Sequence, residues 1–483
     1  MLASALRKLT PKFVLRAYHR ALAQLAAAWY GHPSGQLFVI GVTGTSGKST
    51  TVQFLGRILE HAGATVGWTS TAGFKVAGDE WINDKKMTML GRFQTQRLLR
   101  RMADAGCTHA IVETSSQGVA QSRHVGINYD VAVFTNLTPE HIEAHGGFEN
   151  YKAAKGAFFA HVGASQRKPA ARLNGRVLSG ALPSSPAAAP RPSDDRELAP
   201  ATRPETVPKT FVVNVDDPHA PYFLSFPADR RYGYGLEGKK GPEPAYRLLY
   251  APVIATDIGL SAEGSTFRID GRTMHLKPIG LFNVYNALAA ATAAHAAGLS
   301  WDAIASGVDA LASVPGRLEF VRAGQPFEVV VDYAYEPASL QACYDALDVV
   351  DRRRLIHVLG SAGGGRDVAR RSVLGGMAAR QADVVIVTNE DPYDDDPQLI
   401  INQVADGAAA AGRKDGVDLF RIPDRQDAID QAVAMARPGD LVLVTGKGNE
   451  PVMAVAGGKT VAWDDRDAVR RALVKRNKGE GRG

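Results

Sequence analysis

Short apolar runs separated by helix-forming stretches dominate the chain from residue 36 onward. Between residues 36 and 160 these runs are LFVIGVTG, HAIVETS and VAVFTNL, and each is apolar almost throughout, as strands buried on both faces are. Segments such as TVQFLGRIL, with the composition of helices, lie between them. Strands that alternate with helices predict a parallel α/β sheet in this part of the chain.

A second region of the same kind follows. TFVVNVDDP opens a sheet-like stretch that we expect to extend to about residue 314. EVVVDYA, RLIHVLG, DVVIVTN and DLVLVTG then mark four more strands with helical stretches between them. A second α/β unit is therefore predicted over residues 315–475. At 483 residues the chain exceeds what one core holds, so two or three domains are expected.

Two segments depart from this pattern. Residues 163–208 are dominated by Ala, Pro, Ser and Arg, which predicts a flexible insertion. Residues 1–35 place Arg7, Lys8 and further basic residues before the apolar run ALAQLAAAWY. That run is well short of the roughly 20 residues that span a bilayer. We expect a helical extension, which either packs on the neighbouring domain or gives residues 1–30 a weak association with a membrane surface.

Composition excludes several classes of protein. A hydrophobic content of 45% with 22% charged residues is ordinary for a soluble globular protein. The net charge of +6 is small for this length and predicts no nucleic-acid partner. Cys107 and Cys343 are the only cysteines, too few for a disulfide framework or a four-cysteine zinc site. A reducing cytoplasm is the expected compartment.

The segment FVIGVTGTSGKSTT has the features of a nucleotide-triphosphate loop. Its glycines let backbone N–H groups approach phosphate oxygens, and the start of the following helix adds positive potential. Lys48 supplies a charge for the outer phosphates, and the Ser49 hydroxyl can bind Mg²⁺. The usual Walker spacing asks for glycine where the chain has Val42, and Gly41 and Gly44 stand beside that position instead.

Two further residues lie where a metal would be held. Glu113 ends the strand in AIVETSSQG, and His141 follows the strand in VAVFTNL. Because α/β sheets bind ligands at the carboxyl ends of parallel strands, this carboxylate and imidazole can hold Mg²⁺ opposite the phosphate loop. Each residue taken alone has a plainer interpretation, a surface ion pair for Glu113 and a structural hydrogen bond for His141.

These motifs together resemble the Mur ligase family of ATP-dependent amide ligases. TGTSGKST looks like the ATP loop of that family and of its folylpolyglutamate and cyanophycin synthetase relatives. VETSSQG and TNLTPEHIEAHGGFENYKAAKGAFF are similar to its metal-binding segments. The resemblance implies that Glu113 and His141 bind Mg²⁺ and that Lys155 is carbamylated and holds a second Mg²⁺. Lys152 is a competing position, and an unmodified Lys155 in an ion pair is the alternative.

The resemblance continues through the second half of the chain. IGLFNVYNALAA is similar to the segment that contacts adenine, which implies nucleotide binding by Asn283 and Asn286, although both residues also suit helix capping. VPGRLEF places Arg317 at the hinge into the last domain, and VVVDYAYEPASL places Asp332 beside the triphosphate. Tyr335 stands where the family usually has histidine.

The fold that the resemblance implies is α/β, with a P-loop central ATPase domain followed by a Rossmann-like C-terminal domain. The domains are expected at residues 1–35 (helical extension), 36–314 (central, with the insertion 163–208) and 315–483 (C-terminal). The cofactors implied are ATP and two Mg²⁺ ions. The implied site residues are Lys48, Glu113, His141, Lys155 and Arg317 for catalysis; Gly44, Thr45, Ser46, Gly47, Lys48, Ser49, Thr50, Asn283, Asn286, Arg317 and Asp332 for nucleotide; Ser49, Glu113, His141 and Lys155 for metal; and Ser115, Asp391, Tyr393 and Glu450 for substrate.

The motifs are closest to the branch that adds diaminopimelate or lysine to muramyl peptides, with three departures. About 40 residues precede the ATP loop, where that branch has a UDP-binding domain, so we expect a partner chain to supply one if a UDP-linked substrate is used. EDPY replaces DNPR, which puts Tyr393 where an arginine would bind a distal carboxylate. GKGNEP replaces GKGHED but retains Glu450. With Asp391 and Asp394, Asp395 and Asp396 nearby, this predicts a preference for lysine or a neutral amino acid over diaminopimelate.

The predicted reaction is the joining of a small-molecule or peptide carboxylate to an amino acid. The carboxylate attacks the ATP γ-phosphate to give an acyl phosphate and ADP, and the amine then displaces phosphate. Cell-wall peptide synthesis is the expected setting. A ligase of non-murein or polyglutamate-type peptides is one alternative, and an ATP-dependent switch or scaffold without ligase activity is another.

Overall fold

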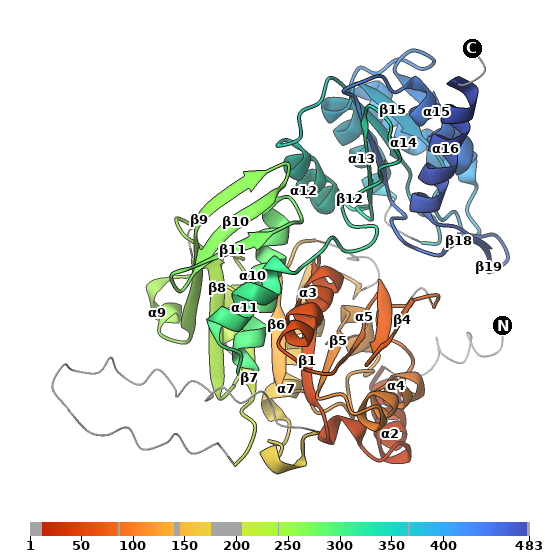
Figure 1. Ribbon diagram of the computed structural model, residues 1–483. Coiled ribbons are helices and arrows are strands. Elements are labelled where there is room, and N and C mark those ends of the chain that lie inside the picture. The colour runs from red at the N-terminus through yellow and green to blue at the C-terminus, as the bar shows by residue number, and fades with distance from the viewer. Residues whose placement is uncertain are drawn as a thin grey trace.

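Two separate β-sheets organise the chain, the first built from residues up to 276 and the second from residues 319 onward (Figure 1). The computed structural model describes residues 12–85, 87–139, 145–174, 205–239, 241–365 and 368–480. Both sheets are largely parallel and have helices on both faces, so the predicted α/β class is confirmed. The division into domains at residues 36–314 and 315–483 follows these sheets, and we retain it as a proposal.

The first sheet has eleven strands in the order β11-β10-β9-β8-β7-β6-β1-β5-β2-β3-β4. From β9 through β2 in this order the strands are parallel, whereas β10 and β11 at one edge and β3 and β4 at the other pair antiparallel. The bounds are β1 Phe38–Thr43, β2 Val66–Thr69, β3 Gly73–Val76, β4 Asp79–Ile82, β5 His109–Glu113, β6 Val131–Phe134, β7 Thr210–Asn214, β8 Arg230–Leu236, β9 Ala251–Ser261, β10 Gly264–Ile269 and β11 Arg272–Leu276.

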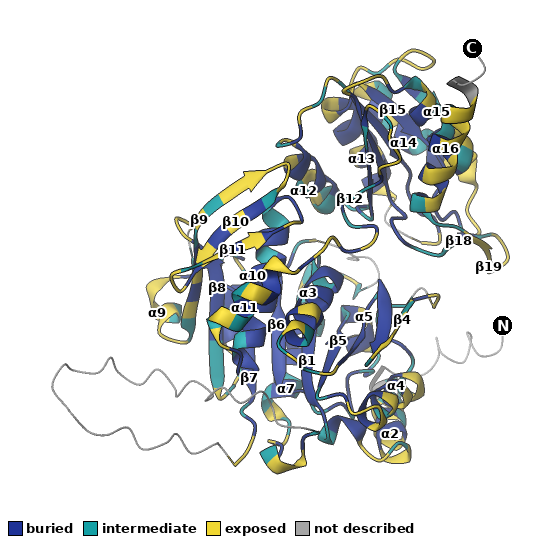
Figure 2. Ribbon diagram, in the orientation of Figure 1, coloured by how far each residue is buried: buried dark blue, intermediate teal, exposed yellow. Residues whose placement is uncertain are grey.

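Helices cover both faces of this sheet and bury its central strands (Figure 2). On one face α3 (Lys48–His61), α10 (Leu281–Ala296) and α11 (Trp301–Asp309) share a core with the strands. On the other face the core includes α4 (Arg92–Asp104), α5 (Ser116–Ala120), α7 (Phe148–Ala164) and α8 (Ala220–Leu224). Every residue of β1 and β5 is buried, which explains why their sequences are apolar without alternation.

The second sheet has six strands in the order β12-β13-β17-β14-β15-β16, parallel except for β12. Helices α12 to α14 pack on one face and α15 and α16 on the other, and β18 and β19 form a separate hairpin. The bounds are β12 Glu319–Phe320, β13 Glu328–Asp332, α12 Pro337–Leu347, β14 Leu355–Leu359, α13 Ala369–Gln381, β15 Val384–Val387, α14 Pro397–Ala410, β16 Leu419–Arg421, α15 Arg425–Met435, β17 Leu441–Thr445, β18 Val452–Val455, β19 Lys459–Ala462 and α16 Asp465–Glu480.

Two sequence predictions need correction. The sheet-like stretch expected to reach residue 314 ends at Leu276, and the helices α10 and α11 follow it, because the alanine-rich run there packs as a helix against α3. Part of the segment 163–208, which was predicted to be a flexible insertion, is ordered. The end of α7, the short 3₁₀ helix η2 (Ala170–Arg172) and the buried Lys168 belong to the folded domain, and within this segment 175–204 lies outside the described residues.

Lys168 is buried because it forms part of an internal charge cluster. Its Nζ donates to Asp130 Oδ2 at 2.5 Å, and Lys209 Nζ donates to the other oxygen of the same carboxylate at 3.2 Å. These two lysines flank the segment 175–204, so the cluster joins both ends of that segment to the sheet. Burial lowers the pKa of Lys168 to about 8, although the Asp130 carboxylate works in the opposite direction.

At the N-terminus, α2 (Lys12–Trp29) packs on α4 and on the turn at Gly126. A short helix, α9 (Pro244–Arg247), and a 3₁₀ turn, η1 (Pro33–Gly35), complete the elements. Within the described ranges no helix is both long enough and apolar enough to cross a membrane.

Candidate active site

The turn between β1 and α3 brings together the residues of the predicted phosphate loop. Gly47 caps α3 with φ 78°, a left-handed conformation that only glycine adopts without strain. A Cβ at Gly44 would lie 1.9 Å from Thr135 Oγ1, so the loop approaches its neighbour more closely than a side chain would allow. This packing accounts for the unusual spacing of the glycines.

A second loop, which follows β6, holds the phosphate loop in place. The Thr45 amide donates to the Asn136 carbonyl at 2.8 Å, and the Ser46 amide donates to Asn136 Oδ1 at 2.9 Å. Thr135 Oγ1 donates to the Ser46 carbonyl at 2.7 Å. Lys48 Nζ donates to the Thr45 carbonyl at 2.7 Å, which places its ammonium over the loop. Thr50 is buried in the first turn of α3.

Ser49 and Glu113 meet at the carboxyl ends of the neighbouring strands β1 and β5. Ser49 Oγ donates to Glu113 Oε2 at 2.8 Å. The backbone amide of Thr71 donates to Glu113 Oε2 at 2.7 Å, and the Thr71 hydroxyl donates to Oε1 at 3.0 Å. Glu113 is almost completely buried, so these donors offset the cost of burying its charge. A hydroxyl and a carboxylate beside a phosphate loop are oxygen ligands of the kind that Mg²⁺ prefers.

Lys155 reaches the same loop from α7. It is 1% exposed, its Nζ donates to the Gly44 carbonyl at 2.6 Å, and it lies 4.4 Å from the centre of the Tyr151 ring. Lys152, the competing position, instead lies near Glu149 at 3.8 Å, over the Tyr222 ring. The structure therefore distinguishes the two lysines and brings only Lys155 to the phosphate loop.

His145, which the sequence prediction did not include, lies close to this group. Its Nε2 is 3.1 Å from Ser116 Oγ and its ring packs against Tyr151. Burial and the nearby Lys155 charge lower the pKa of His145. His141 itself lies outside the described residues. Ser115 caps α5 by accepting the Gly118 amide at 3.2 Å. Among the described residues, no three acidic, histidine or cysteine side chains cluster closely enough to form a metal site by themselves.

Helix α10 connects the phosphate loop with the second sheet. Asn286 is buried, and a Cβ at Gly47 would lie 2.2 Å from its Oδ1, so this amide packs directly on the loop. Asn283 donates to the Ile279 carbonyl at 2.9 Å. Ile279 belongs to the hydrophobic core around α12, so the start of α10 contacts the C-terminal unit. Asn283 and Asn286 therefore lie on a helix that contacts both the phosphate loop and the C-terminal unit.

Arg317 and Asp332 lie together where the second sheet begins. Asp332 accepts the amides of Leu318 and Ala334, both at 2.7 Å. Burial raises the pKa of Asp332, although the Arg317 charge works in the opposite direction. The Arg317 guanidinium is 4.1 Å from the centre of the Tyr333 ring, and its buried Nε has no hydrogen-bond partner among the described residues.

Tyr333 links Arg317 to the predicted substrate residue Glu450. The Tyr333 hydroxyl donates to Glu450 Oε1 at 2.8 Å. Glu450 Oε2 accepts a hydrogen bond from the fully buried Lys447, whose Nζ also donates to Asp391 Oδ2 at 2.9 Å. Burial works against the charge of Lys447, but the two carboxylates raise its pKa. A continuous set of contacts thus runs from Arg317 to Asp391.

Glu390 adds a further carboxylate at this point. It is buried, and its Oε2 has no hydrogen-bond partner among the described residues. A Cβ at Gly446 would lie 2.6 Å from that oxygen, so it faces the turn that precedes Lys447. Burial raises the pKa of Glu390, although the nearby Arg425 charge works in the opposite direction.

The three exposed aspartates after Tyr393 have local structural roles. Asp394 accepts the Gly457 amide at 2.7 Å, Asp395 Oδ2 lies 3.4 Å from Arg371, and Asp396 caps α14 by accepting the Gln398 amide at 2.9 Å. Their predicted attraction for a substrate ammonium is weakened by these contacts. Tyr393 adopts a left-handed conformation, with φ 54°, and its ring packs on Gly364.

Comparisons with known proteins show the family of this chain. The family model described as Mur ligase middle domain matches residues 42–173, and that of the Mur ligase glutamate ligase domain matches 316–448. A UDP-N-acetylmuramyl-tripeptide synthetase of Roseiflexus sp. (strain RS-1) is 37% identical over 466 residues, which cover 94% of this chain and 82% of the relative. The chain belongs to the Mur ligase family.

Further relatives place it within that family. A UDP-N-acetylmuramoyl-L-alanyl-D-glutamate–2,6-diaminopimelate ligase of Geobacillus kaustophilus (strain HTA426) is 35% identical, over 94% of this chain and 82% of the relative. A solved structure of a ligase with the same description has a TM-score of 0.55 at 27% identity, covering 91% of this chain and 79% of that one. Folylpolyglutamate synthase of Mycobacterium tuberculosis, at 18% identity and a TM-score of 0.59 over 90% and 96% of the two chains, shares the fold.

Membership of the Mur ligase family makes this chain an enzyme, an ATP-dependent and ADP-forming amide ligase that uses Mg²⁺. The alternative of a switch or scaffold without ligase activity is therefore set aside. Sequence reasoning missed Asn136, Tyr333, Glu390 and Lys447. Each of the four follows the end of a strand or lies next to a predicted site residue, and this position in the sequence could have indicated them.

Proposed function

We propose that this Mur ligase activates a peptide carboxylate as an acyl phosphate and joins it to an amino acid, in the synthesis of cell-wall peptide. The observation that carries the proposal is the hydrogen bond of 2.8 Å between Ser49 and Glu113 at the base of the phosphate loop. It joins a phosphate-loop hydroxyl to a buried carboxylate, the pair of oxygen ligands that a nucleotide-bound Mg²⁺ needs.

In this assignment the loop from Gly44 to Thr50 binds the triphosphate, and Lys48 offsets the charge of the transferring phosphoryl group. Ser49 and Glu113 would hold Mg²⁺, joined by His141 and by Lys155 if it is carbamylated. Bound Mg²⁺ supplies charge neutralisation of the phosphates. Asn283 and Asn286 bind the nucleotide, and Arg317 and Asp332 contact it from the C-terminal unit. The Arg317 Nε, which has no hydrogen-bond partner within the described part of the chain, supports this role.

Carbamylation of Lys155 would change what this side chain offers. An unmodified ammonium is a donor only, as in its hydrogen bond to the Gly44 carbonyl. A carbamate retains one N–H for that carbonyl and adds two acceptor oxygens, which can hold a second Mg²⁺. The buried position beside the loop and the resemblance of the segment around Lys155 support this modification.

The amine substrate is proposed to bind beside Asp391, Glu450 and Glu390. Asp391 and Glu450 both pair with Lys447, and Glu390 lies beside them, so an incoming ammonium would meet carboxylate oxygens here. Among the described residues Glu390 Oε2 has no hydrogen-bond partner, and its pKa is raised by burial, so it is suited to hold this ammonium and accept its proton. The neutral amine then attacks the acyl phosphate carbonyl, and phosphate leaves with the former carboxylate oxygen.

For the acceptor, we propose the peptide named in the descriptions of the relatives, UDP-N-acetylmuramoyl-L-alanyl-D-glutamate. For the amino acid, we propose lysine or a neutral residue. Tyr393 offers no cation to a distal carboxylate, and Arg371 is buried and engaged by Gln403 at 2.6 Å and by the Ala362 carbonyl at 3.2 Å. Arg366 lies outside the described residues.

Rates of ADP release across a substrate matrix test this proposal. The matrix combines lysine, ornithine, alanine, glutamate and meso-diaminopimelate with the UDP-linked peptide and with a UDP-free peptide ending in glutamate. We expect release that requires both an amine and a carboxylate, with lysine or alanine preferred over diaminopimelate. Use of the UDP-free peptide alone would favour a non-murein ligase. ADP release that no amine or acceptor stimulates would contradict the proposal.

A further inference from the structure

Arg425 is a buried arginine at the start of α15 that the proposed reaction does not use. Its side chain is 1% exposed, and that of its partner Asp465, the first residue of α16, is 0% exposed. The guanidinium donates to both Asp465 oxygens, from Nε at 2.8 Å and from Nη2 at 2.7 Å. A cation at the start of a helix opposes the helix dipole, so helix formation does not account for an arginine at this position.

The guanidinium also binds the chain just beyond the ends of two strands. Nη2 donates to the Thr445 carbonyl at 2.7 Å, and Nη1 donates to the Asn389 carbonyl at 3.2 Å. Thr445 is the last residue of β17, and Asn389 lies two residues beyond the end of β15. The turns that follow carry the charged residues of the proposed amine site, Glu390 and Asp391 in one and Lys447 and Glu450 in the other. One planar group thus binds the start of both turns.

Asp465 holds the second of these turns from its far end. After Thr445 the chain leaves the sheet, forms the β18–β19 hairpin and returns at Trp463. The Trp463 indole Nε1 donates to Asp465 Oδ1 at 2.8 Å, and the Trp463 amide donates to the Pro451 carbonyl at 3.0 Å. Because Arg425 binds both Thr445 and Asp465, it joins the residue before this excursion to the residue after it.

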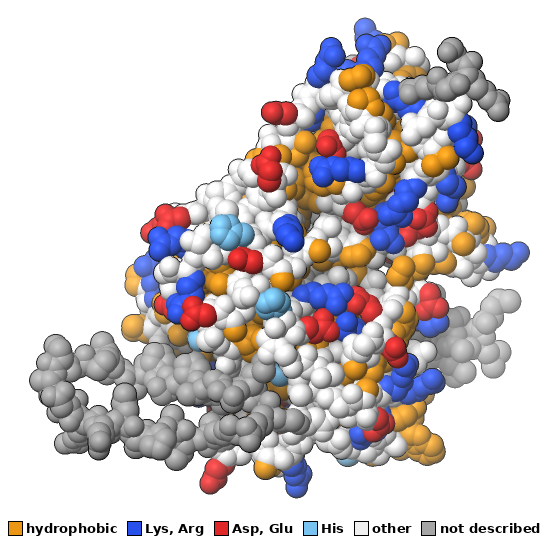
Figure 3. Space-filling view, viewed as in Figure 1, with side chains coloured by type: hydrophobic (Ala, Val, Ile, Leu, Met, Phe, Trp, Pro, Cys, Tyr) orange, Lys and Arg blue, Asp and Glu red, His pale blue; other side chains and the backbone are white. Residues whose placement is uncertain are grey.

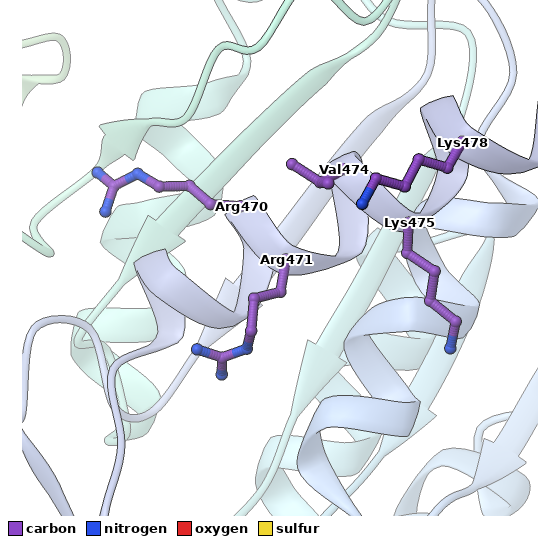
Figure 4. A pocket seen from close by; sticks show the side chains of 5 residues that line it. All are labelled: Arg470, Arg471, Val474, Lys475 and Lys478. Atoms are coloured by element: carbon purple, nitrogen blue, oxygen red, sulfur yellow. The ribbon is translucent and has the colours of Figure 1, made fainter.

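Another arginine joins the same two helices at the surface. Figure 3 shows basic side chains where α16 lies in Figure 1. Arg470, Arg471, Val474, Lys475 and Lys478 line an open pocket there (Figure 4). Arg471 is exposed and donates to Gln426 Oε1 of α15 at 2.8 Å. This contact between α15 and α16 therefore provides a comparison for the buried pair.

We propose that the Arg425–Asp465 pair positions the two turns of the amine site, so that their carboxylates face one incoming ammonium. The inference rests on the proposed function of Glu390 and Glu450. Burial works against the charge of Arg425, but Asp465 and the nearby Glu390 raise its pKa, so the guanidinium stays ionised. A planar fork can bind several acceptors in a fixed geometry, and the single nitrogen of a lysine on its flexible stem reproduces this poorly.

Steady-state ADP release by the full chain tests the proposal, with the amine that the wild type uses best and with ATP varied in turn. The variants are Arg425→Lys and the double variant Arg425→Met/Asp465→Asn. In both, the KM for the amine should rise about tenfold while the KM for ATP stays the same. The double variant leaves no buried charge unpaired and retains an acceptor for Trp463, so it should fold. A merely structural role would reduce the folded fraction, which lowers kcat and moves neither KM.

A similar ion pair at the opposite end of the same sheet supplies the matched control. Arg354 and Asp440 directly precede β14 and β17, and Arg354 Nη2 donates to Asp440 Oδ2 at 2.6 Å. Arg354→Met/Asp440→Asn removes this pair and should change neither KM. Arg471→Gln, which alters the exposed contact between α15 and α16, should also leave both constants unchanged.

Glu450→Gln separates the failure of this inference from the failure of the proposed function. Wild-type ADP release that does not depend on an amine would overturn both. A higher KM for the amine in Glu450→Gln, with an unchanged KM in both Arg425 variants, would overturn this inference alone. So would an equal rise in the KM for ATP, or an equal rise in the KM for the amine in Arg354→Met/Asp440→Asn.

Discussion

Tyr333 joins the proposed nucleotide contact Arg317 to the proposed amine contact Glu450, and Tyr333→Phe should separate the two. The substitution removes only the hydroxyl that donates to Glu450 at 2.8 Å and leaves the ring 4.1 Å from the Arg317 guanidinium. Glu450 retains its hydrogen bond from Lys447 but loses a fixed orientation. The KM for the amine should rise while the KM for ATP stays the same.

The magnitude follows from the kind of contact. A hydrogen bond to a charged group contributes about 1.5–3 kcal/mol, and with Lys447 still in place we expect the lower value. This corresponds to an increase of about tenfold in the KM for the amine. Tyr333→Leu also removes the ring beneath Arg317, a cation–π contact that contributes roughly 0.5–2 kcal/mol. That variant should raise the KM for ATP as well, by roughly twofold to thirtyfold.

Steady-state ADP release measures both constants, with the amine varied at saturating ATP and ATP varied at saturating amine. Tyr344→Phe is the matched control, because its hydroxyl lies 2.8 Å from His357 Nδ1 in the core of the same unit. It should cost about 1 kcal/mol of stability and change neither KM. An unchanged KM for the amine in Tyr333→Phe, or an equal rise in both constants, would refute the link.

Three further predictions concern the phosphate loop, Lys155 and the stability of the whole chain. Lys48→Ala should lower ADP formation by on the order of a hundredfold or more and leave thermal unfolding nearly unchanged. Arg57→Ala, at an exposed ion pair with Glu60 and Glu80, is the control and should keep its activity. Wild-type turnover of Lys48→Ala would contradict the phosphate-loop assignment. Lys155→Ala should lose activity, and bicarbonate or a short carboxylic acid should partly restore it. Lys152→Ala should keep its activity. An unmodified Lys155 in crystals grown with Mg²⁺ and nucleotide at neutral pH would count against the carbamate. Burial lowers the pKa of His357 and His124 to about 3 and that of His109 to about 4. Because the unfolded chain protonates these histidines near pH 6.5 and the folded chain does not, the free energy of unfolding should fall as pH falls, by up to about 4 kcal/mol per pH unit near pH 5. Urea denaturation at about pH 7 and pH 5 measures this, and equal stability at both values would exclude it.

The nucleotide side of the site was largely predictable from the sequence. Ser49 and Glu113 follow or end apolar strands, and adjacent parallel strands bring their carboxyl ends together, so their contact was expected. The choice of Lys155 over Lys152 depends on which side of α7 faces the loop. The resemblance pointed to Lys155, which does reach the loop, and its role there stays a proposal. Asn286 was predicted as a nucleotide contact, but its packing on Gly47 requires strands β9 to β11 and helix α10 to be placed first.

The proposed amine site was less predictable, because its charged residues are positioned by turns. Asp391, Lys447 and Glu450 come from two loops, and their pairing depends on loop conformations that have no sequence period. Asp394, Asp395 and Asp396 read as an acidic cluster, but two of them bind backbone amides and one lies near Arg371. Sequence alone does not distinguish aspartates that bind neighbouring backbone amides from aspartates that face a substrate.

Transfer of a heavy-oxygen label from the substrate carboxylate tests the proposed acyl phosphate route most directly. This route moves one carboxylate oxygen to phosphorus, and the amine then releases that oxygen within inorganic phosphate. We expect one labelled oxygen in the phosphate for each amide bond formed, with ADP as the nucleotide product. Unlabelled phosphate, or label in AMP, would contradict the route.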